Sequence, residues 1–180
     1  MSIAICPGSY DPVTLGHLDI ITRSSRIFDH VIVAVMINPK KKTSFTVEER
    51  IDLLRRATAG LTGVEVVGFS GLLADYARQR GATAIVKGLR AVTDFEYEFQ
   101  MALTNKKLNP HVETLFMTTR SEYMYLSSSM VKQVAMFGGD ISEDIPACIL
   151  PDVKARLCPE QPPAQLKNKA DGDEVNKRFP

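Results

Sequence analysis

Short apolar runs alternate with longer, helix-like patterns from the first residues to Leu157. The clearest run is Val31–Ile37 (VIVAVMI), which is nearly all apolar, as is typical of a strand buried on both faces. Thr14–Phe28 instead repeats its apolar residues at helical spacing. The pattern predicts strands at Ser2–Cys6, Val31–Ile37, Val64–Val67, Thr83–Val86 and Thr114–Met117. It predicts helices at Thr14–Phe28, from Thr46 to before Gly60, at Ser70–Arg80, from Thr93 to about Leu108, at Ser127–Phe137 and from about Pro151 to Leu157.

Two helix starts carry the capping-box pattern, in which a threonine is followed three residues later by a glutamate. Thr46 precedes Glu49 in this way, and Thr93 precedes Glu96. Strands that alternate with helices of this length indicate the α/β class. We therefore expect a Rossmann-like, doubly wound parallel sheet of five strands with helices on both faces.

The character of the sequence changes near residue 159. Residues 1–158 are long enough for one well-buried domain and show no internal repeat. Residues 159–180 are rich in Pro, Lys, Asp and Asn and lack periodic apolar positions, which favours a disordered tail. The alternative is a surface segment that docks on a neighbouring molecule.

Composition narrows the possible partners and compartments. The net charge is +1, so the strongly basic stripe expected of a nucleic-acid-binding domain is missing. The three cysteines have no metal-type spacing, which favours a reducing compartment and therefore the cytoplasm. Neither a signal-like segment nor a run long enough to cross a membrane is visible, so we expect no membrane partner.

Ligands of doubly wound sheets bind outside the carboxyl ends of the strands. Four segments of this chain fall at such ends, and each carries polar or cationic side chains. They are Pro7–His17, Asn38–Lys42, Lys87–Arg90 and the loop that leads to Ser127–Ser129.

The first of these segments combines glycines, hydroxyls and a histidine at the start of a helix. Gly8 can let the backbone turn tightly, and Ser9 offers a hydroxyl there. Thr14 can cap the helix, whose first free amides favour anions, and Gly16 clears space beside His17. The alternative is that Gly8 only makes a turn while His17 packs against the sheet.

The other three segments are suited to phosphate, with a simpler alternative for each. One lysine of Lys40–Lys42 can reach inward, or the whole run can be a solvated face. Lys87 and Arg90 can clamp a phosphate or pair with the acids of Asp94–Glu98. Ser127–Ser129 offers hydroxyls and free amides at a positive helix end, although one serine is enough for a cap.

Several other phosphate or nucleophile motifs are missing. The sequence has no GxxxxGK[ST] P-loop and no GxGxxG after its first strand. His17 has no evident nucleophile partner, so the residues suggest no Cys-His or Ser-His-Asp arrangement.

These residues resemble the signatures of a known superfamily. Thr14-Leu15-Gly16-His17 is similar to the [T/H]xGH signature of the nucleotidyltransferases, and Leu126–Ser129 resembles their second, serine-rich signature. The longer strings PGSYDPVTLGHLDII and KGLRAVTDFEYEFQMALTNKKL resemble the bacterial phosphopantetheine adenylyltransferase family. This resemblance implies that one nucleotidyltransferase domain makes dephospho-coenzyme A and pyrophosphate from ATP and 4′-phosphopantetheine, with Mg²⁺. It also implies a cytoplasmic homohexamer, a dimer of trimers.

The resemblance further implies which residues form the site. The catalytic residues would be His17, Lys41 and Arg90. ATP would be bound by Ser9, Tyr10, His17, Gly88, Leu89, Arg90, Glu98, Tyr123, Met124, Tyr125, Leu126, Ser127, Ser128 and Ser129. Phosphopantetheine would be bound by Ser9, Lys41, Leu73 and Lys87. No protein ligand for the metal is implied. Tyr10 departs from the usual phenylalanine, and Met124 and Leu126 also depart from the usual residues.

The expected reaction is a direct in-line attack of the 4′-phosphate on the α-phosphorus of ATP, with no covalent intermediate. The attacking phosphate is already an anion, so the reaction needs positioning and cations rather than a general base. One alternative is a related transferase that uses nicotinate mononucleotide or glycerol 3-phosphate. Another is a nucleotide sensor that binds ATP without transferring it.

Overall fold

A parallel sheet of five strands forms the centre of the computed structural model, which describes residues 1–37, 42–90 and 92–158. The strands lie in the order β3-β2-β1-β4-β5, and every neighbouring pair is parallel. They are β1 (Ile3–Gly8), β2 (His30–Met36), β3 (Val64–Phe69), β4 (Ala84–Leu89) and β5 (Glu113–Thr118). The order confirms the predicted doubly wound sheet.

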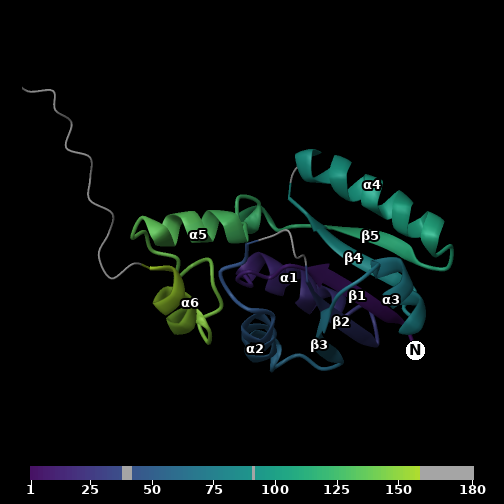
Figure 1. The fold of residues 1–180 in the computed structure, drawn as a ribbon, viewed down its shortest axis with the longest axis horizontal. Helices are drawn as coiled ribbons and strands as arrows, with labels where there is room; N and C mark the ends of the chain where they lie inside the picture. The colour runs from purple at the N-terminus through teal and green to yellow at the C-terminus, as the bar shows by residue number, and fades with distance from the viewer. Residues whose placement is uncertain (38–41, 91, 159–180) are drawn as a thin grey trace, which may run out of the picture.

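Helices cover both faces of this sheet (Figure 1). They are α1 (Leu15–Ser24), α2 (Val47–Thr58), α3 (Leu73–Gln79), α4 (Val92–Leu108), α5 (Ser128–Met136) and α6 (Leu150–Leu157), with a 3₁₀ turn, η1, at Ser121–Tyr123. Alternate strand residues face opposite layers. Ala4 and Cys6 face the core shared with α1, α2, α5 and α6, whereas Ile5 packs with Ala77 of α3. Figure 1 also shows α4 lying along β4 and β5 at the margin of the molecule.

The sheet changes its winding direction between β1 and β4. The chain runs from β1 outward through β2 to β3 and then returns to pair β4 with the other side of β1. The carboxyl ends of β1 and β4 therefore flank the point where a crevice opens in such sheets. Gly8 ends β1 and Leu89 ends β4.

Two of the three predicted threonine caps are present. Thr14 and Thr46 each accept a backbone N–H three residues ahead, and the side chains of His17 and Glu49 accept in return from the cap backbone. The predicted cap at Thr93 is wrong, because α4 begins at Val92 and Thr93 therefore lies within its first turn.

The predicted loop at Lys87–Arg90 is mostly strand. Lys87, Gly88 and Leu89 pair with Phe116, Met117 and Thr118, so β4 extends three residues beyond the apolar run that predicted it. Pairing with β5, rather than local hydrophobicity, sets the end of this strand.

Two predicted helices are shorter in the structure. Helix α1 ends at Ser24 rather than Phe28, because the amides of Arg26 and Ile27 bond three residues back, to Arg23 and Ser24, as in a 3₁₀ turn. Helix α3 begins at Leu73 rather than Ser70, after Gly71, whose φ of 128° is not helical. The predicted tail, residues 159–180, lies outside the described residues.

Candidate active site

A cavity of about 480 Å³ opens at the switch point of the sheet. The end of β1, the first turn of α1 and the end of β4 form three of its sides, and the segment from Tyr123 to Ser128 forms the fourth. The predicted site residues that line this first cavity are Tyr10, His17, Lys87, Gly88, Arg90, Glu98, Tyr123, Leu126, Ser127 and Ser128. Three of the four predicted segments, Pro7–His17, Lys87–Arg90 and the loop that leads to Ser127–Ser129, thus meet at this cavity, as their positions at strand ends predicted. Of the fourth, Asn38–Lys42, only Lys42 is among the described residues, and it lines a second cavity.

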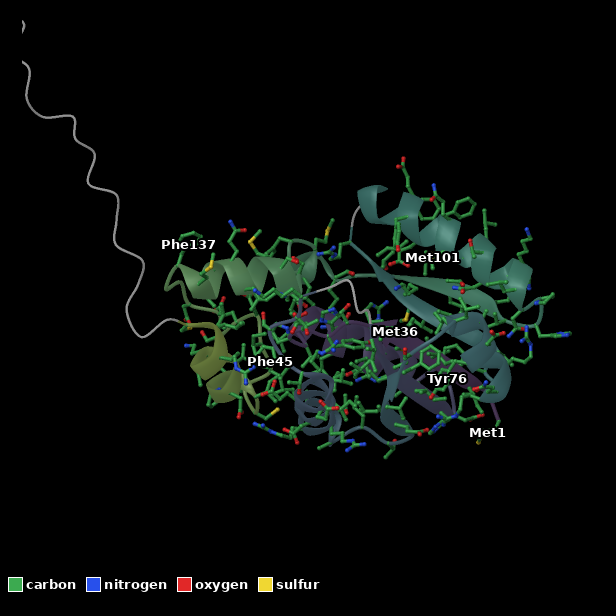
Figure 2. The ribbon with its side chains drawn as sticks, in the orientation of Figure 1. Met1, Met36, Phe45, Tyr76, Met101 and Phe137 are labelled. Atoms are coloured by element: carbon green, nitrogen blue, oxygen red, sulfur yellow. The ribbon has the colours of Figure 1, made fainter. Side chains whose placement is uncertain are left out.

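A second cavity of about 970 Å³ lies on the side of α3 and α4. Met36 and Met101, both labelled in Figure 2, line it together with Leu73. The two cavities share a wall that includes His17, Lys87 and Arg90. A molecule in either cavity can therefore contact these three side chains.

His17 is fixed at this wall by the cap of α1. Its Nδ1 accepts from the backbone N–H of Thr14 at 3.1 Å and lies 2.9 Å from the Thr14 hydroxyl. A backbone N–H can only donate, so Nδ1 is an acceptor and the ring proton is on Nε2. Burial, followed by the positive charges of Arg90 and Lys87, lowers the pKa of His17 from 6.5 to about 4. At neutral pH His17 is therefore an uncharged hydrogen-bond donor.

Tyr10 holds the turn behind His17. Its hydroxyl donates to the carbonyl of Cys6 at 2.9 Å, and its ring makes an edge contact with the imidazole, with centroids 5.1 Å apart. The residue has a φ of 49°, a strained value for a side chain of this size. A Cβ on Gly8 would lie 2.9 Å from the Tyr10 ring. Gly8 is therefore needed for room beside this ring, and the tight turn predicted at Gly8 lies at Tyr10 instead.

Gly16 lines the first cavity next to His17. A Cβ there would lie 3.5 Å from Cβ of Tyr123 and 3.8 Å from Cδ2 of Leu126, which is ordinary packing distance. The first turn of α1 therefore packs directly on the segment that closes the first cavity.

Both members of the cationic pair after the fourth predicted strand bond to groups of the protein itself. Lys87 forms an ion pair with Glu98 of α4 at 3.1 Å, as the simpler alternative expected. Both side chains also line the two cavities. Arg90 donates to the carbonyl of Leu126 at 3.2 Å and lines both cavities as well. Lys87 and Arg90 thus stand where a phosphate between the two cavities would meet them.

The three serines divide their roles. Ser127 caps α5 by accepting from the amide of Met130 at 3.1 Å. Ser128 donates to the carbonyl of Pro12 at 2.8 Å, which ties α5 to the β1–α1 turn. Ser129 lines the second cavity. Ser127 alone therefore provides the cap, whereas Ser128 lines both cavities and Ser129 lines the second.

The remaining predicted residues separate into three groups. Ser9 lines the second cavity, and Tyr123 and Leu126 line the first. Leu89, Met124 and Tyr125 are described but are not among the residues lining either cavity, and Tyr125 instead donates to Asp144. Lys41 lies outside the described residues, although Lys42 lines the second cavity.

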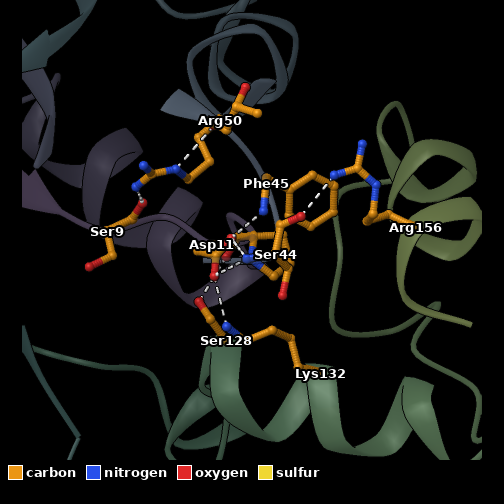
Figure 3. A network of polar contacts seen from close by, with 10 residues as sticks. Ser9, Asp11, Ser44, Phe45, Arg50, Ser128, Lys132 and Arg156 are labelled. Carbon is orange, nitrogen blue, oxygen red and sulfur yellow. Dashed lines mark hydrogen bonds and ion pairs between the residues drawn. The ribbon is translucent and has the colours of Figure 1, made fainter. Parts of the chain in front are cut away.

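An ion pair at the edge of the site was not predicted from the sequence. Asp11 and Lys132 both line the second cavity, and Lys132 Nζ lies 2.7 Å from Oδ2 of Asp11 (Figure 3). A carboxylate directly after a strand end was a visible signal. Its partner was not predictable, because it is separated from Asp11 by 121 residues.

Neither a metal-binding cluster nor a membrane-spanning helix is found among the residues that the structure describes. Within residues 1–37, 42–90 and 92–158, no group of three or more His, Cys, Asp or Glu side chains is placed to hold a metal ion. In the same part of the chain, no helix has the length and apolar character needed to cross a membrane.

Comparison with known proteins gives consistent matches. The family model described as cytidylyltransferase-like matches residues 5–134. A phosphopantetheine adenylyltransferase of Heliobacterium modesticaldum is 57% identical over 150 residues, which cover 83% of this chain and 89% of that protein. The chain belongs to the phosphopantetheine adenylyltransferase family. A member of this family from Clostridium botulinum strain 657 is 53% identical and covers 87% of this chain and 96% of its own length.

A solved structure supports the fold alone. The nicotinic acid mononucleotide adenylyltransferase of Plasmodium falciparum superposes with a TM-score of 0.61 at 15% identity. The alignment covers 87% of this chain and 96% of that one. The doubly wound sheet is therefore shared with a distant adenylyltransferase.

Proposed function

We propose that this chain is a pantetheine-phosphate adenylyltransferase, which moves AMP from ATP to 4′-phosphopantetheine and releases pyrophosphate. The observation that carries the proposal is the wall shared by the two cavities, where His17, Lys87 and Arg90 meet. The first cavity, at the helix starts, suits the nucleotide. The second is larger and partly lined by Leu73, Met36 and Met101, which suits the pantetheine arm.

The transfer is a single displacement. An oxygen of the 4′-phosphate forms a bond to the α-phosphorus of ATP while the bond from that phosphorus to the bridging β-oxygen breaks. Pyrophosphate leaves with the electron pair. The attacking oxygen carries no proton to remove, so the site must bring two anions together and stabilise the charge between them.

The shared wall supplies what this step requires. Neutral His17 donates from Nε2 to an oxygen of the transferred phosphate, because its Nδ1 is held by Thr14. Lys87 and Arg90 add positive charge on either side. The start of α5 faces the departing pyrophosphate with the positive end of its helix dipole. Lys41 remains a predicted catalytic residue outside the described residues.

Magnesium enters this proposal as part of the substrate. The described residues form no carboxylate or imidazole cluster for a resident ion. We therefore propose that Mg²⁺ arrives bound to the phosphates of ATP and has few protein ligands.

We also propose a cytoplasmic location, which the three free thiols Cys6, Cys148 and Cys158 support.

We propose a homohexamer built as a dimer of trimers. Helix α4 and its neighbour β5 expose large apolar side chains that a solvated surface would not favour. They are Phe95, Tyr97, Phe99, Met101, Leu103, Leu108 and Leu115. In light scattering, we expect six times the 19.9 kDa of one chain. Leu103→Glu should lower this mass, whereas Ile27→Glu, at a comparably exposed position outside α4, should not. An unchanged mass in the Leu103 variant would exclude this face as the interface.

The function is tested by pyrophosphate release from MgATP with three acceptors offered separately. Release with 4′-phosphopantetheine alone is the expected result. Release with nicotinate mononucleotide or glycerol 3-phosphate would keep the ATP assignment and overturn the acceptor. Binding of ATP without release with any acceptor would favour a nucleotide sensor.

A further inference from the structure

Asp11 is a buried carboxylate whose two oxygens are fully engaged. The residue is 4% exposed. Oδ1 accepts from the amides of Ser44 at 3.0 Å and Phe45 at 2.9 Å, and Oδ2 accepts from Lys132 Nζ at 2.7 Å (Figure 3). These contacts come from two different segments, one preceding α2 and the other in α5.

The contacts of Asp11 join both sides of the second cavity. Lys42 and Thr43, which line that cavity, directly precede the two anchored amides. Lys132 lies one helical turn after Ser128, and it lines the cavity from the side of α5. The Asp11 carboxylate is thus the point at which the β2–α2 loop and α5 are both attached to the β1–α1 turn.

Two further bonds strengthen this junction. The Ser128 hydroxyl donates to the carbonyl of Pro12 at 2.8 Å, and Arg50 donates to the carbonyl of Ser9 at 2.7 Å. Figure 3 shows both residues directed toward the β1–α1 turn. The turn is therefore held from α2 and from α5 by bonds to its backbone, and the Asp11 carboxylate adds bonds from the turn to the segment before α2 and to α5.

A negative charge at this place opposes the binding of polyphosphates. Coulomb repulsion between Asp11 and a triphosphate is weak only if a cation cancels the charge of the carboxylate. Lys132 is that cation. An asparagine would avoid the charge, but it has one acceptor oxygen and cannot receive all three donors. The carboxylate is thus suited to positioning, and the lysine makes it compatible with an anionic ligand.

We propose that Asp11 is a positioning residue of the transfer reaction, which holds the Lys42–Phe45 loop and helix α5 on either side of the cavity. Asp11 and Lys132 line the second cavity, but Ser128, at the start of α5 where the pyrophosphate of ATP is proposed to lie, lines both cavities. Lys132 completes this role by neutralising Asp11, so that the phosphates of ATP can bind beside it. This inference rests on the proposed binding of ATP and phosphopantetheine in the two cavities.

Three variants separate positioning from direct phosphate binding. Asp11→Asn should lower kcat/KM for phosphopantetheine by roughly 10–100-fold, because the loop loses its anchor. Lys132→Met should weaken ATP binding by roughly 10-fold, because it leaves the Asp11 charge unpaired. In the double variant, ATP affinity should return toward the wild-type value. A double variant that binds ATP as weakly as Lys132→Met would overturn neutralisation and make Lys132 a phosphate ligand.

Hydrogen exchange gives a readout that needs no substrate. The amides of Ser44 and Phe45 should exchange slowly in the wild type and at least tenfold faster in Asp11→Asn. Unchanged exchange at both amides would overturn the positioning role. Asp152→Asn is the matched control, since it weakens an exposed ion pair in which Arg56 and Asp152 lie 2.7 Å apart. Neither of these residues lines either cavity. The control variant should change neither readout.

The two proposals fail differently. A wild-type protein that binds no MgATP would overturn the proposed function, whatever the exchange rates are. A wild-type protein that binds MgATP, with variants of normal affinity and normal exchange, would overturn the inference alone.

Discussion

Substitution of His17 tests whether the site uses this residue as a neutral donor. His17→Ala removes the Nε2 donor and also the acceptor that satisfies the Thr14 amide. Loss of one donor to a developing oxyanion costs roughly 10²–10³-fold in kcat. We therefore expect that decrease in pyrophosphate release, with a smaller change in the KM for either substrate.

The same substitution has a calculable effect on stability. Losing half of a capping box costs about 1 kcal/mol, and losing the edge contact with Tyr10 costs about 1 kcal/mol more. A decrease of about 2 kcal/mol corresponds to a melting temperature roughly 4–8 °C lower in a chain of this size. Thermal unfolding should therefore show a folded but less stable protein.

His17→Gln is the matched variant. Glutamine at this position of a capping box can accept from the Thr14 amide, so stability should return toward that of the wild type. Its amide is also a neutral donor, so the kcat of His17→Gln should be at least roughly tenfold higher than the kcat of His17→Ala. A stable glutamine variant that is no more active than the alanine variant would refute donation by a neutral side chain. Near-normal turnover in His17→Ala would refute any role of His17 in the transfer.

The remaining predictions concern the pH response, the cationic wall and the packing at the end of β4. Nitrogen NMR should find the His17 proton on Nε2 and no protonation until about pH 4, and titration near 6.5 would contradict the buried, neutral ring. The lowered pKa means that the unfolded chain takes up a proton first. Denaturant titrations should therefore show that the free energy of unfolding of the wild type, relative to that of His17→Gln, falls as the pH is lowered from 6.5 to 4. The decrease should be at most about 3 kcal/mol. Lys87→Met should raise the KM for phosphopantetheine more than that for ATP, and an effect on ATP alone would reverse the assignment of the cavities. Gly88→Ala places a Cβ 2.9 Å from Cγ1 of Ile20 and should destabilise by roughly 1–2 kcal/mol. Gly60→Ala, which meets nothing within 4 Å, should be nearly neutral, and equal losses would exclude a steric cause.

Local patterns predicted those parts of the fold that local physics determines. Thr14 and Thr46 cap their helices because a hydroxyl and a partner three residues ahead are enough to make the reciprocal bonds. Val31–Val35 is buried on both faces, as its unbroken apolar run predicted. The meeting of Pro7–His17, Lys87–Arg90 and the loop before Ser129 also followed from their places at strand ends.

The sequence predicted less where a distant partner decides the outcome. Lys87–Leu89 is strand because β5 pairs with it, and no local hydrophobicity marks that extension. The sequence indicated that position 8 needs a glycine, but it did not give the correct reason. The space is taken by the ring of Tyr10, two residues later in the chain, which packs against Gly8. The bond between Asp11 and Lys132 joins two residues whose separate patterns give no sign of each other.

The common wall of the two cavities has a consequence for the energetics of the product. Two separate substrates each lose translational and rotational freedom on binding, whereas their joined product loses it only once. A molecule with an adenylate half and a pantetheine half can contact both cavities across His17, Lys87 and Arg90. The architecture therefore favours tight retention of the product, and a covalently linked bisubstrate compound should bind more strongly than either half.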